Sequence, residues 1–253
     1  FDPYLSSWVP YSGAVYAVGS SVAKIVAAGG DGSKIHFTFQ EYFRRMNSDP
    51  SRWSQPFAAL LGAYGAQLGL GLGSIGGKDS MSGTFNDKHV VPTLISFACS
   101  DAKTNNIITP QLKTPGNRLV VFKPQISEEG LPELSSYKTM FAAVSEGIRQ
   151  GTIVSAYVGE AGGALAALFK MSFGNRLGFA IGGGQGLRQL QPGLIVAEVT
   201  PQFADEHAAV IGEVKAGPQY RINELKLSQD EVLAAWMGTL GSLYPVYSKG
   251  EAQ

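Results

Sequence analysis

Helical and strand patterns alternate along the whole chain, and this alternation limits the possible folds more than any other feature of the sequence. Apolar residues recur at helical spacing over 10–28 and 58–68, and strand-like runs occupy 34–40 and 90–100. In the second half, strands are predicted at 118–124, 152–158, 176–183, 193–199 and 208–214, and helices at 135–150, 162–173 and 228–241. The interleaving of the two patterns predicts an α/β (α+β) fold throughout.

A polar segment divides this pattern into two parts. Residues 101–117, DAKTNNIITPQLKTPGN, carry two prolines and a glycine between strand-like runs. Such composition is typical of a connection between domains. We therefore expect two α/β domains packed side by side, over residues 1–112 and 113–253.

The charge content is low and balanced. Charged residues make up 16% of the 253 residues, against about 25% in typical globular chains. Lys plus Arg equals Asp plus Glu at 20 each, so nothing in the balance favours nucleic acid or a membrane surface as a partner. No window approaches 18 consecutive apolar residues, so no membrane span is expected. The weakly charged surface instead predicts large interfaces with other domains or subunits.

The cysteine content bears on the cellular compartment of the protein, and the first residues bear on whether the chain is a piece of a longer protein. The single cysteine, Cys99, lies in the apolar run LISFACS. A lone cysteine provides no disulfide framework and suits a reducing cytoplasm, and we expect Cys99 to be a small core residue. The chain begins FDPYLSS, without methionine, which favours a piece of a longer protein.

The stretch LGSIGGKDSMSGTF, residues 72–85, carries the strongest chemical signal. A glycine pair lets backbone amides converge on an anion, and a lysine adds positive charge for a phosphate. The P-loop formula G-x-x-x-x-G-K-[ST] fails twice, however, because Leu72 stands five residues before Gly77 and Asp79 follows Lys78. The residues alone leave a phosphate-binding loop and a glycine-rich turn equally open.

Two further glycine clusters give weaker signals. GGGQG at 182–186 lacks the G-x-G-x-x-G spacing and is interpreted as a loop between strands. GEAGG at 159–163 precedes a helix, so its amides can face an anion, although Glu160 opposes that use. We favour close helix–strand packing as the reason for these glycines.

Other catalytic patterns are missing from the sequence. His36, His89 and His207 have no ligand partner at helical spacing, so a zinc site is not expected. No G-x-S-x-G elbow is present, so no Ser-His-Asp set is proposed. Phe37 and Phe39 alternate in HFTFQEYF and are interpreted as core residues of a half-buried strand.

Several blocks in order resemble a known family. GGKDSMSGTF, then PTLISFA, then ITPQLKTPGNRLVVF resemble the large single-chain phosphoribosylformylglycinamidine synthases of purine biosynthesis, which carry a GKDS motif, an SFA strand and a T-P-x-x-K segment in this order. FDPYLSSWVPYSGAVYAVGSSVAKIVAAGG and AGGALAALFKMSFGN are similar to further elements of that family. The resemblance covers nearly the whole chain.

The resemblance implies a fold and a reaction. The family is built from two halves like aminoimidazole ribonucleotide synthetase, each an A-type domain followed by a B-type domain. This chain resembles the second half, with a partial A-type domain at 1–112 and a B-type domain at 113–253. The implied reaction is ATP-dependent amidation of formylglycinamide ribonucleotide with ammonia from glutamine. The implied partners are the first synthetase half and a glutaminase domain, and an exposed pseudo-dimer surface predicts self-association of the chain by itself.

The family also implies an auxiliary nucleotide site with magnesium, held by the second half. The matching nucleotide-binding positions are Gly76, Gly77, Lys78, Asp79, Ser80, Gly162 and Gly163. The metal-ligand positions are occupied here by Ser20, Lys24 and Val158. Because magnesium prefers oxygen ligands, the resemblance implies ATP or ADP with magnesium in the full enzyme but no cofactor and no metal in this chain. It implies no catalytic residue here either, so we expect this half to be structural and inactive alone.

Two alternatives stay open beside this interpretation. One is another ATP-using protein of the aminoimidazole ribonucleotide and selenophosphate synthetase superfamily. The other is a structural assembly module that keeps the fold for packing only.

Overall fold

The structure, a computed structural model, describes residues 1–183 and 185–244. Its helices are α1 (Pro3–Trp8), α2 (Pro10–Ala27), α3 (Pro50–Leu70), α4 (Leu134–Arg149), α5 (Gly163–Phe173) and α6 (Gln229–Gly241), with 3-10 turns η1 (Thr104–Asn106) and η2 (Gln185–Leu187). Its strands are β1 (His36–Tyr42), β2 (Gly73–Ser80), β3 (Thr84–Phe85), β4 (Lys88–His89), β5 (Thr93–Cys99), β6 (Arg118–Phe122), β7 (Ile153–Val158), β8 (Gly178–Ile181), β9 (Ile195–Val199), β10 (Ala208–Lys215), β11 (Gln219–Ile222) and β12 (Leu225–Ser228). None of the helices described combines the length and the apolar character needed to cross a membrane.

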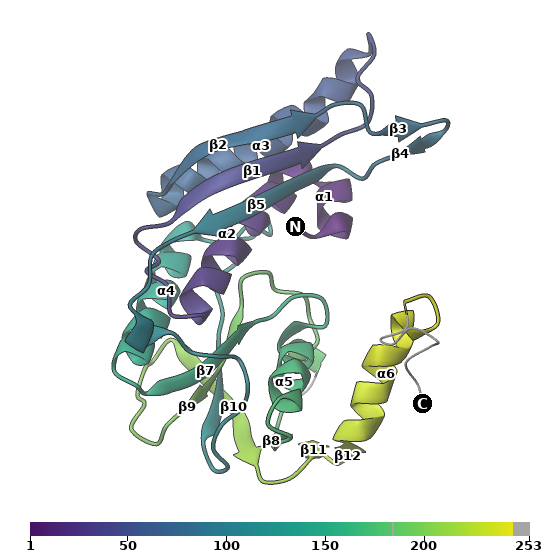
Figure 1. Ribbon diagram of the computed structural model, residues 1–253. Helices are drawn as coiled ribbons and strands as arrows, with labels where there is room; N and C mark the ends of the chain where they lie inside the picture. The colour runs from purple at the N-terminus through teal and green to yellow at the C-terminus, as the bar shows by residue number, and fades with distance from the viewer. Residues whose placement is uncertain (184, 245–253) are drawn as a thin grey trace.

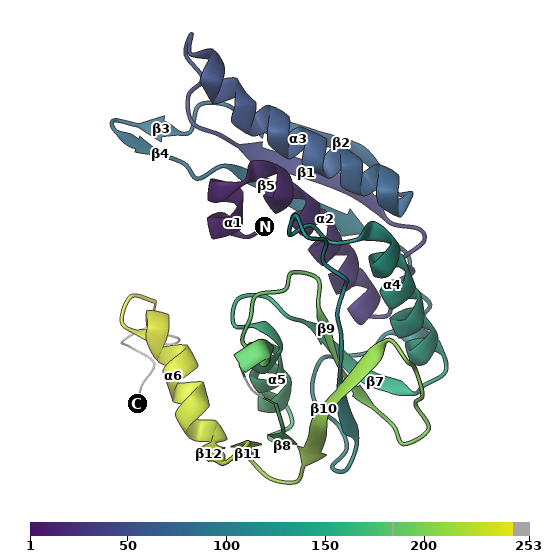
Figure 2. The ribbon, with the colours of Figure 1, turned by 180° about the vertical axis from the view of Figure 1, so that it is seen from behind.

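The first part of the chain builds a three-stranded sheet in the order β2-β1-β5. Strand β1 pairs in parallel with β2 and antiparallel with β5. Helices α2 and α3 lie on one face of this sheet, and the two ribbon views agree that no helix of the described residues covers the other face (Figure 1, Figure 2). Phe37 is fully buried beneath the helices and Phe39 is half-buried, which confirms their assignment to the core.

The second part builds a seven-stranded sheet in the order β12-β11-β8-β10-β6-β9-β7. Its central strand β6 alternates between two cores. Val120 and Phe122 pack with α4 on one face, and Leu119 and Val121 pack with α5 on the other. Every residue of β9 is buried, as expected for a strand that is covered on both faces.

One hydrophobic core joins the two parts. It runs from α2 and α3 through Tyr137, Phe141 and Val144 of α4 to the inner face of the second sheet. Small residues allow this close packing: a Cβ on Gly62 would lie 2.2 Å from the carbonyl oxygen of Tyr11. The two sheets lie on either side of the predicted boundary at 112/113, and the boundary itself stays a prediction.

A buried carboxylate fastens the connecting segment to the second sheet. Glu198 of β9 is fully buried. It accepts hydrogen bonds from the backbone N–H groups of Lys113 (2.7 Å) and Thr114 (2.9 Å) and from the side-chain amide of Asn117 (2.7 Å). These donors solvate the charge inside the protein, so the end of the connection is held in one path.

The predicted helices and the longer strands are confirmed, while several details differ. The capping box of Ser228 and Glu231 at the start of α6 is present. Helix α1 and strands β11 and β12 were not expected. Cys99 is exposed, which corrects its assignment to the core; it lies opposite His36 on the sheet face that no helix covers. The predicted loop at 182–186 includes residue 184, and residues 184 and 245–253 lie outside the described residues.

Candidate functional site

The GGKDS residues form a strand and not a loop, which corrects the sequence-based expectation. Residues Gly76 to Ser80 belong to β2 and pair in parallel with β1. Neither Gly76 nor Gly77 has positive φ, so their amides do not converge as in an anion cradle. A Cβ on Gly77 would lie 2.8 Å from the carbonyl oxygen of Phe39. The glycine is therefore explained by the close approach of two strands.

The charged side chains of this strand already have partners in β1. The Lys78 ammonium lies 5.3 Å from the centre of the Tyr42 ring, a cation–π contact. Asp79 lies opposite Glu41, whose side chain is buried. Burial, a hydrogen bond with Asp79 and the charge of Asp79 raise the pKa of Glu41 to about 8. Near neutral pH the buried Glu41 side chain is therefore protonated and uncharged.

The second predicted glycine pair has the local geometry of a tight turn. Gly162 is the N-cap of α5 with φ of 86°, and Gly163 follows with φ of 62°. Both values lie in the left-handed region, which glycine adopts without strain. A Cβ on Gly163 would lie 2.5 Å from the carbonyl oxygen of Gln189. Gly163 thus serves close packing, but against residues 187–189 and not against a strand, which corrects the predicted helix–strand crossing.

Three positions from distant parts of the chain meet beside this turn. A cavity of about 230 Å³ is lined by Ser20 and Lys24 of α2, by Ser96 of β5 and by Glu160 in the turn before α5. Val158, at the end of β7, lines an adjacent cavity of about 260 Å³ that shares Lys24 and Glu160. The structure therefore brings together Ser20, Lys24 and Val158, which the resemblance identified as metal-ligand positions.

Lys24 and Glu160 form an ion pair across this cavity. Each side chain is about half exposed, at 57% and 47%. The sequence pointed to each residue separately, but the pairing was missed because α2 and the β7–α5 turn are more than a hundred residues apart. Because the charges of Lys24 and Glu160 are opposite, the pair adds no net charge to the cavity.

This donor set does not suit magnesium. The cavity offers the hydroxyl of Ser20, the cation of Lys24 and the buried apolar side chain of Val158 at the three positions, whereas magnesium requires several hard oxygen ligands. The carboxylate of Glu160 is already paired with Lys24. Among residues 1–183 and 185–244, no group of three or more His, Cys, Asp or Glu side chains is placed to hold a metal ion.

The GGKDS strand and the cavity lie at opposite edges of the first sheet. The cavity is lined by Ser96 of the edge strand β5, whereas β2 is the other edge strand, beyond β1. The seven predicted nucleotide-binding residues are thus divided between two places in the fold. Only Gly162 and Gly163 lie near the Lys24–Glu160 ion pair.

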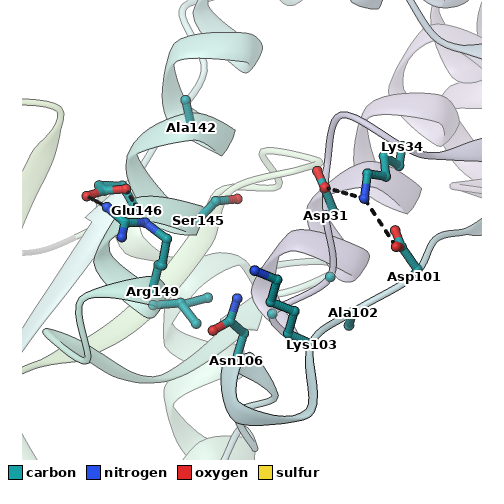
Figure 3. A pocket seen from close by; sticks show the side chains of 13 residues that line it. Asp31, Lys34, Asp101, Ala102, Lys103, Asn106, Ala142, Ser145, Glu146 and Arg149 are labelled. Carbon is teal, nitrogen blue, oxygen red and sulfur yellow. Dashed lines mark hydrogen bonds and ion pairs between the residues drawn. The ribbon is translucent and has the colours of Figure 1, made fainter.

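A second cavity, of about 340 Å³, lies between α4, the turn after α2 and the segment 101–106 (Figure 3). Most of its charged groups are also paired internally. Lys34 contacts Asp101 at 3.2 Å and Asp31 at 3.5 Å, and Arg149 pairs with Glu146. Because acids and bases balance at this cavity, it does not have the excess positive charge of a phosphate site.

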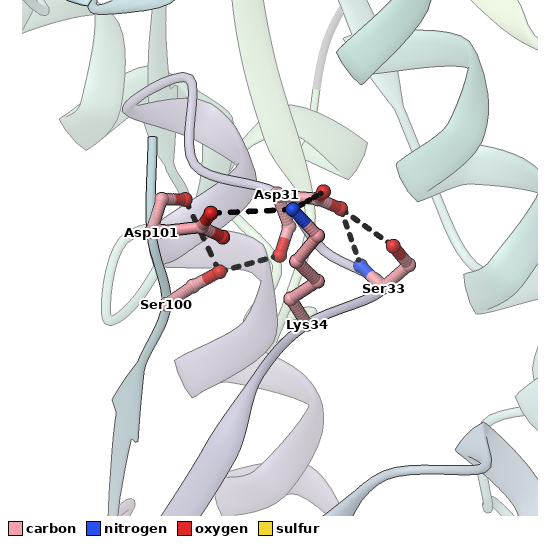
Figure 4. Close-up of polar contacts among 5 residues, drawn as sticks. All are labelled: Asp31, Ser33, Lys34, Ser100 and Asp101. Atoms are coloured by element: carbon pink, nitrogen blue, oxygen red, sulfur yellow. Dashed lines mark hydrogen bonds and ion pairs between the residues drawn. The ribbon is translucent and has the colours of Figure 1, made fainter. Parts of the chain in front are cut away.

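The acidic residues of this second cavity have structural roles (Figure 4). The Asp31 carboxylate accepts bonds from the Ser33 hydroxyl (2.6 Å) and backbone N–H (3.0 Å), and these bonds lower the pKa of Asp31. Ser100 donates to the backbone oxygen of Asp31 at 2.7 Å. The cluster fastens the α2–β1 turn to the end of β5.

Comparisons with known proteins define the fold. No protein-family profile and no curated protein sequence matches the chain. Among solved structures, Thermotoga maritima PurL complexed with ATP is similar, with a TM-score of 0.71 and 16% identity. The match covers 90% of this chain but 42% of PurL, so the chain spans less than half of the PurL length.

Two shorter proteins are similar over most of their own length. Thiamine monophosphate kinase from Aquifex aeolicus matches with a TM-score of 0.61 and 13% identity, covering 88% of this chain and 84% of the kinase. A chain of the HypE–HypF complex matches with a TM-score of 0.62 and 14% identity, covering 85% and 83%. These similarities show that the chain has the aminoimidazole ribonucleotide synthetase-like fold.

Proposed function

We propose that this chain is the second synthetase half of a phosphoribosylformylglycinamidine synthase, a cytoplasmic ligase of purine biosynthesis. The whole enzyme converts formylglycinamide ribonucleotide, glutamine and ATP into formylglycinamidine ribonucleotide. Two observations support the proposal together: the similarity to PurL over 90% of the chain and the ordered GGKDS, SFA and T-P-x-x-K blocks. Its partners are then the first synthetase half and the glutaminase domain.

Within that enzyme, we propose that this half is a packing partner and not the catalytic half. The Lys24–Glu160 ion pair carries this part of the proposal. In the proposed ancestral site, a metal ion balanced the charge of a nucleotide. Here the ammonium of Lys24 lies at one of the metal-ligand positions, and Glu160 neutralises it. A nucleotide phosphate would meet the Glu160 carboxylate without a metal ion between them, which disfavours binding.

Calorimetric titration with ADP, with and without magnesium, tests the packing role. We expect no binding in either condition. The variant Ser20→Glu/Lys24→Asn restores two oxygen ligands and removes the cation, so it is expected to gain magnesium-dependent ADP binding. Lys24→Met, which removes the cation without adding a ligand, is the matched control. Micromolar, magnesium-dependent binding by the unchanged chain would overturn this proposal.

An amidation assay tests the enzyme assignment. The chain alone is expected to produce no formylglycinamidine ribonucleotide from formylglycinamide ribonucleotide, ATP and ammonia. The chain together with the first synthetase half is expected to produce it. Turnover by the chain alone would contradict the structural role, and no turnover with the first half present would contradict the assignment to this ligase.

A second candidate is a self-sufficient ATP-using protein of the same fold. It is favoured by coverage, since the chain matches 84% of the thiamine monophosphate kinase chain but 42% of PurL. This candidate predicts ATP hydrolysis or phosphoryl transfer by the chain alone. An ATP turnover assay on the isolated chain separates the two candidates.

A further inference from the structure

Helix α3 has almost no charge along its whole length. Its 21 residues, PSRWSQPFAALLGAYGAQLGL, include one charged side chain, Arg52. A helix on the surface of a globular protein usually has a polar outer face. The composition of α3 is instead that of a helix covered on both sides.

The inner face of α3 accounts for its small residues. Ala59, Gly62, Ala63 and Ala66 are buried, and α3 packs closely against α2 in the core that joins the two sheets. These residues have little or no side chain, so the axes of the two helices approach closely. The large apolar residues of α3 are therefore free to lie on the other face.

The outer face of α3 is a continuous apolar stripe, here called the α3 stripe. Its residues are half exposed or more in most cases: Trp53 53%, Phe57 61%, Leu60 56%, Leu61 42%, Tyr64 58% and Leu68 64%. At 100° per residue, all six fall within roughly 100° of the helix circumference. Within residues 1–183 and 185–244, no other helix or strand lies over this face in the view from behind (Figure 2). Contiguous apolar patches of this kind mark interaction sites.

The α3 stripe is complementary to itself across a two-fold axis. The six positions are symmetric about the point between residues 60 and 61. In an antiparallel pair of α3 helices centred there, the facing residues are Trp53 with Leu68, Phe57 with Tyr64, and Leu60 with Leu61. Each apolar residue meets another apolar residue, as a two-fold interface requires, and Arg52 faces Gly69, so no like charges meet.

We infer that the α3 stripe is a dimer interface between two copies of this chain, formed by antiparallel packing of α3 on α3. The available area supports a second copy as the occupant. The exposed parts of the six side chains amount to roughly 700 Å², given the size of aromatic and leucine side chains, and a standard interface buries about 800 Å² per partner. This face differs from the uncovered face of the three-stranded sheet, and the inference does not depend on the proposed function.

Analytical ultracentrifugation of the 253-residue chain over a range of concentrations tests the interface. We expect a dimer whose dissociation constant rises roughly 100-fold in Phe57→Glu/Tyr64→Glu, because each added carboxylate would be buried against an aromatic ring of the partner. A control places a charge on another exposed apolar surface, with Leu240→Glu on α6. This control is expected to leave the dimer unchanged.

Cross-linking tests the antiparallel arrangement. Cys99 is exposed, so the test uses a Cys99→Ser background with a short bismaleimide. Leu61→Cys lies beside the two-fold axis and is expected to cross-link to its own copy. Leu68→Cys is the control, because the two copies of residue 68 would be about 22 Å apart along the helix axis at 1.5 Å rise per residue. It is not expected to cross-link.

Three outcomes would overturn the inference. They are a monomer at all concentrations up to about 100 μM, a weak affinity by the standards of specific dimers; a dimer that survives Phe57→Glu/Tyr64→Glu with native circular dichroism; and a dimer that Leu240→Glu weakens equally. Cross-linking of Leu68→Cys, with none for Leu61→Cys, would likewise exclude the antiparallel pairing.

Discussion

The two sheets of this protein differ in how far each completes its own packing. The seven-stranded sheet has a helix on each face of its central strands, and β9 is buried throughout. The three-stranded sheet has helices on one face only, and seven of the eight residues of its edge strand β2 are exposed. Outside it, the α3 stripe is exposed as well. The second sheet is therefore stabilised within the chain, whereas the first presents surfaces suited to partners.

The largest effect is expected at Glu198, which lies in the seven-stranded sheet. Glu198→Ala leaves the Lys113 and Thr114 N–H groups and the Asn117 amide without their acceptor. The free energy of unfolding should fall by about 4 kcal/mol, because each buried donor left unsatisfied costs about 1–3 kcal/mol. Urea denaturation measures it, with the half-exposed Glu213→Ala as control. A loss below about 1 kcal/mol, the size of an ordinary hydrogen bond, would show that the stability of the second sheet does not depend on the hydrogen bonds of Glu198.

A pair of glycines compares the two regions directly. Gly163→Ala forces an L residue into φ of 62° and places a Cβ 2.5 Å from the carbonyl oxygen of Gln189, so we expect a loss of about 2–3 kcal/mol. Gly76→Ala in β2 meets open space at a backbone without positive φ, and its effect should stay within about 0.5 kcal/mol. Thermal unfolding of the two variants checks the difference. Equal losses would mean that β2 is as tightly constrained as the α5 turn.

The third prediction concerns pH and the contact between β1 and β2. Because the folded state raises the pKa of Glu41 from 4.5 to about 8, the folded protein binds more protons than the unfolded chain between these values. Stability should therefore fall as pH rises through this range, by about 2 kcal/mol, a value limited by the solvent that reaches the exposed Asp79. Urea denaturation at several pH values measures the slope. Glu41→Gln should remove most of it, and an unchanged slope in that variant would assign it to another group.

The last prediction concerns the ion pair at the candidate site, where a small effect is expected. Lys24 and Glu160 are each about half exposed, so Glu160→Gln should cost less than about 1 kcal/mol. The same urea experiment measures it, with added salt as an internal control, since salt should weaken a contact of this kind. A loss of several kcal/mol would mean that the pair is a packing element of the second sheet and not a substitute for a bound ion.

The predictable part of the fold is local. Helical spacing located α2 and α4 closely, and Ser228 with Glu231 predicted the start of α6, because capping depends only on neighbouring residues. Helix α1 and the short strands β11 and β12 were missed, because so few residues carry little periodicity. Cys99 was placed in the core since its neighbours are apolar, but the sequence does not say which strand faces lack a covering helix.

The candidate site shows the same division. The resemblance singled out Ser20, Lys24 and Val158, and the fold brings them together. The burial of Glu41 could have been predicted from the sequence. It alternates with Phe37 and Phe39, so it lies on the same face of the strand as these two core residues. The strand conformation of GGKDS had no such signal in the sequence, because a glycine pair is compatible with both a loop and a crowded strand.

The sequence by itself determined the α/β class, the order of the main elements and the shortage of charge, because periodicity and composition act over short distances. Only the tertiary structure decided which distant residues meet. The pairing of Lys24 with Glu160, the burial of Glu198 and the exposure of the α3 stripe all depend on how helices pack on sheets. Such packing is set by contacts between residues far apart in the chain, and local patterns do not encode those contacts one by one.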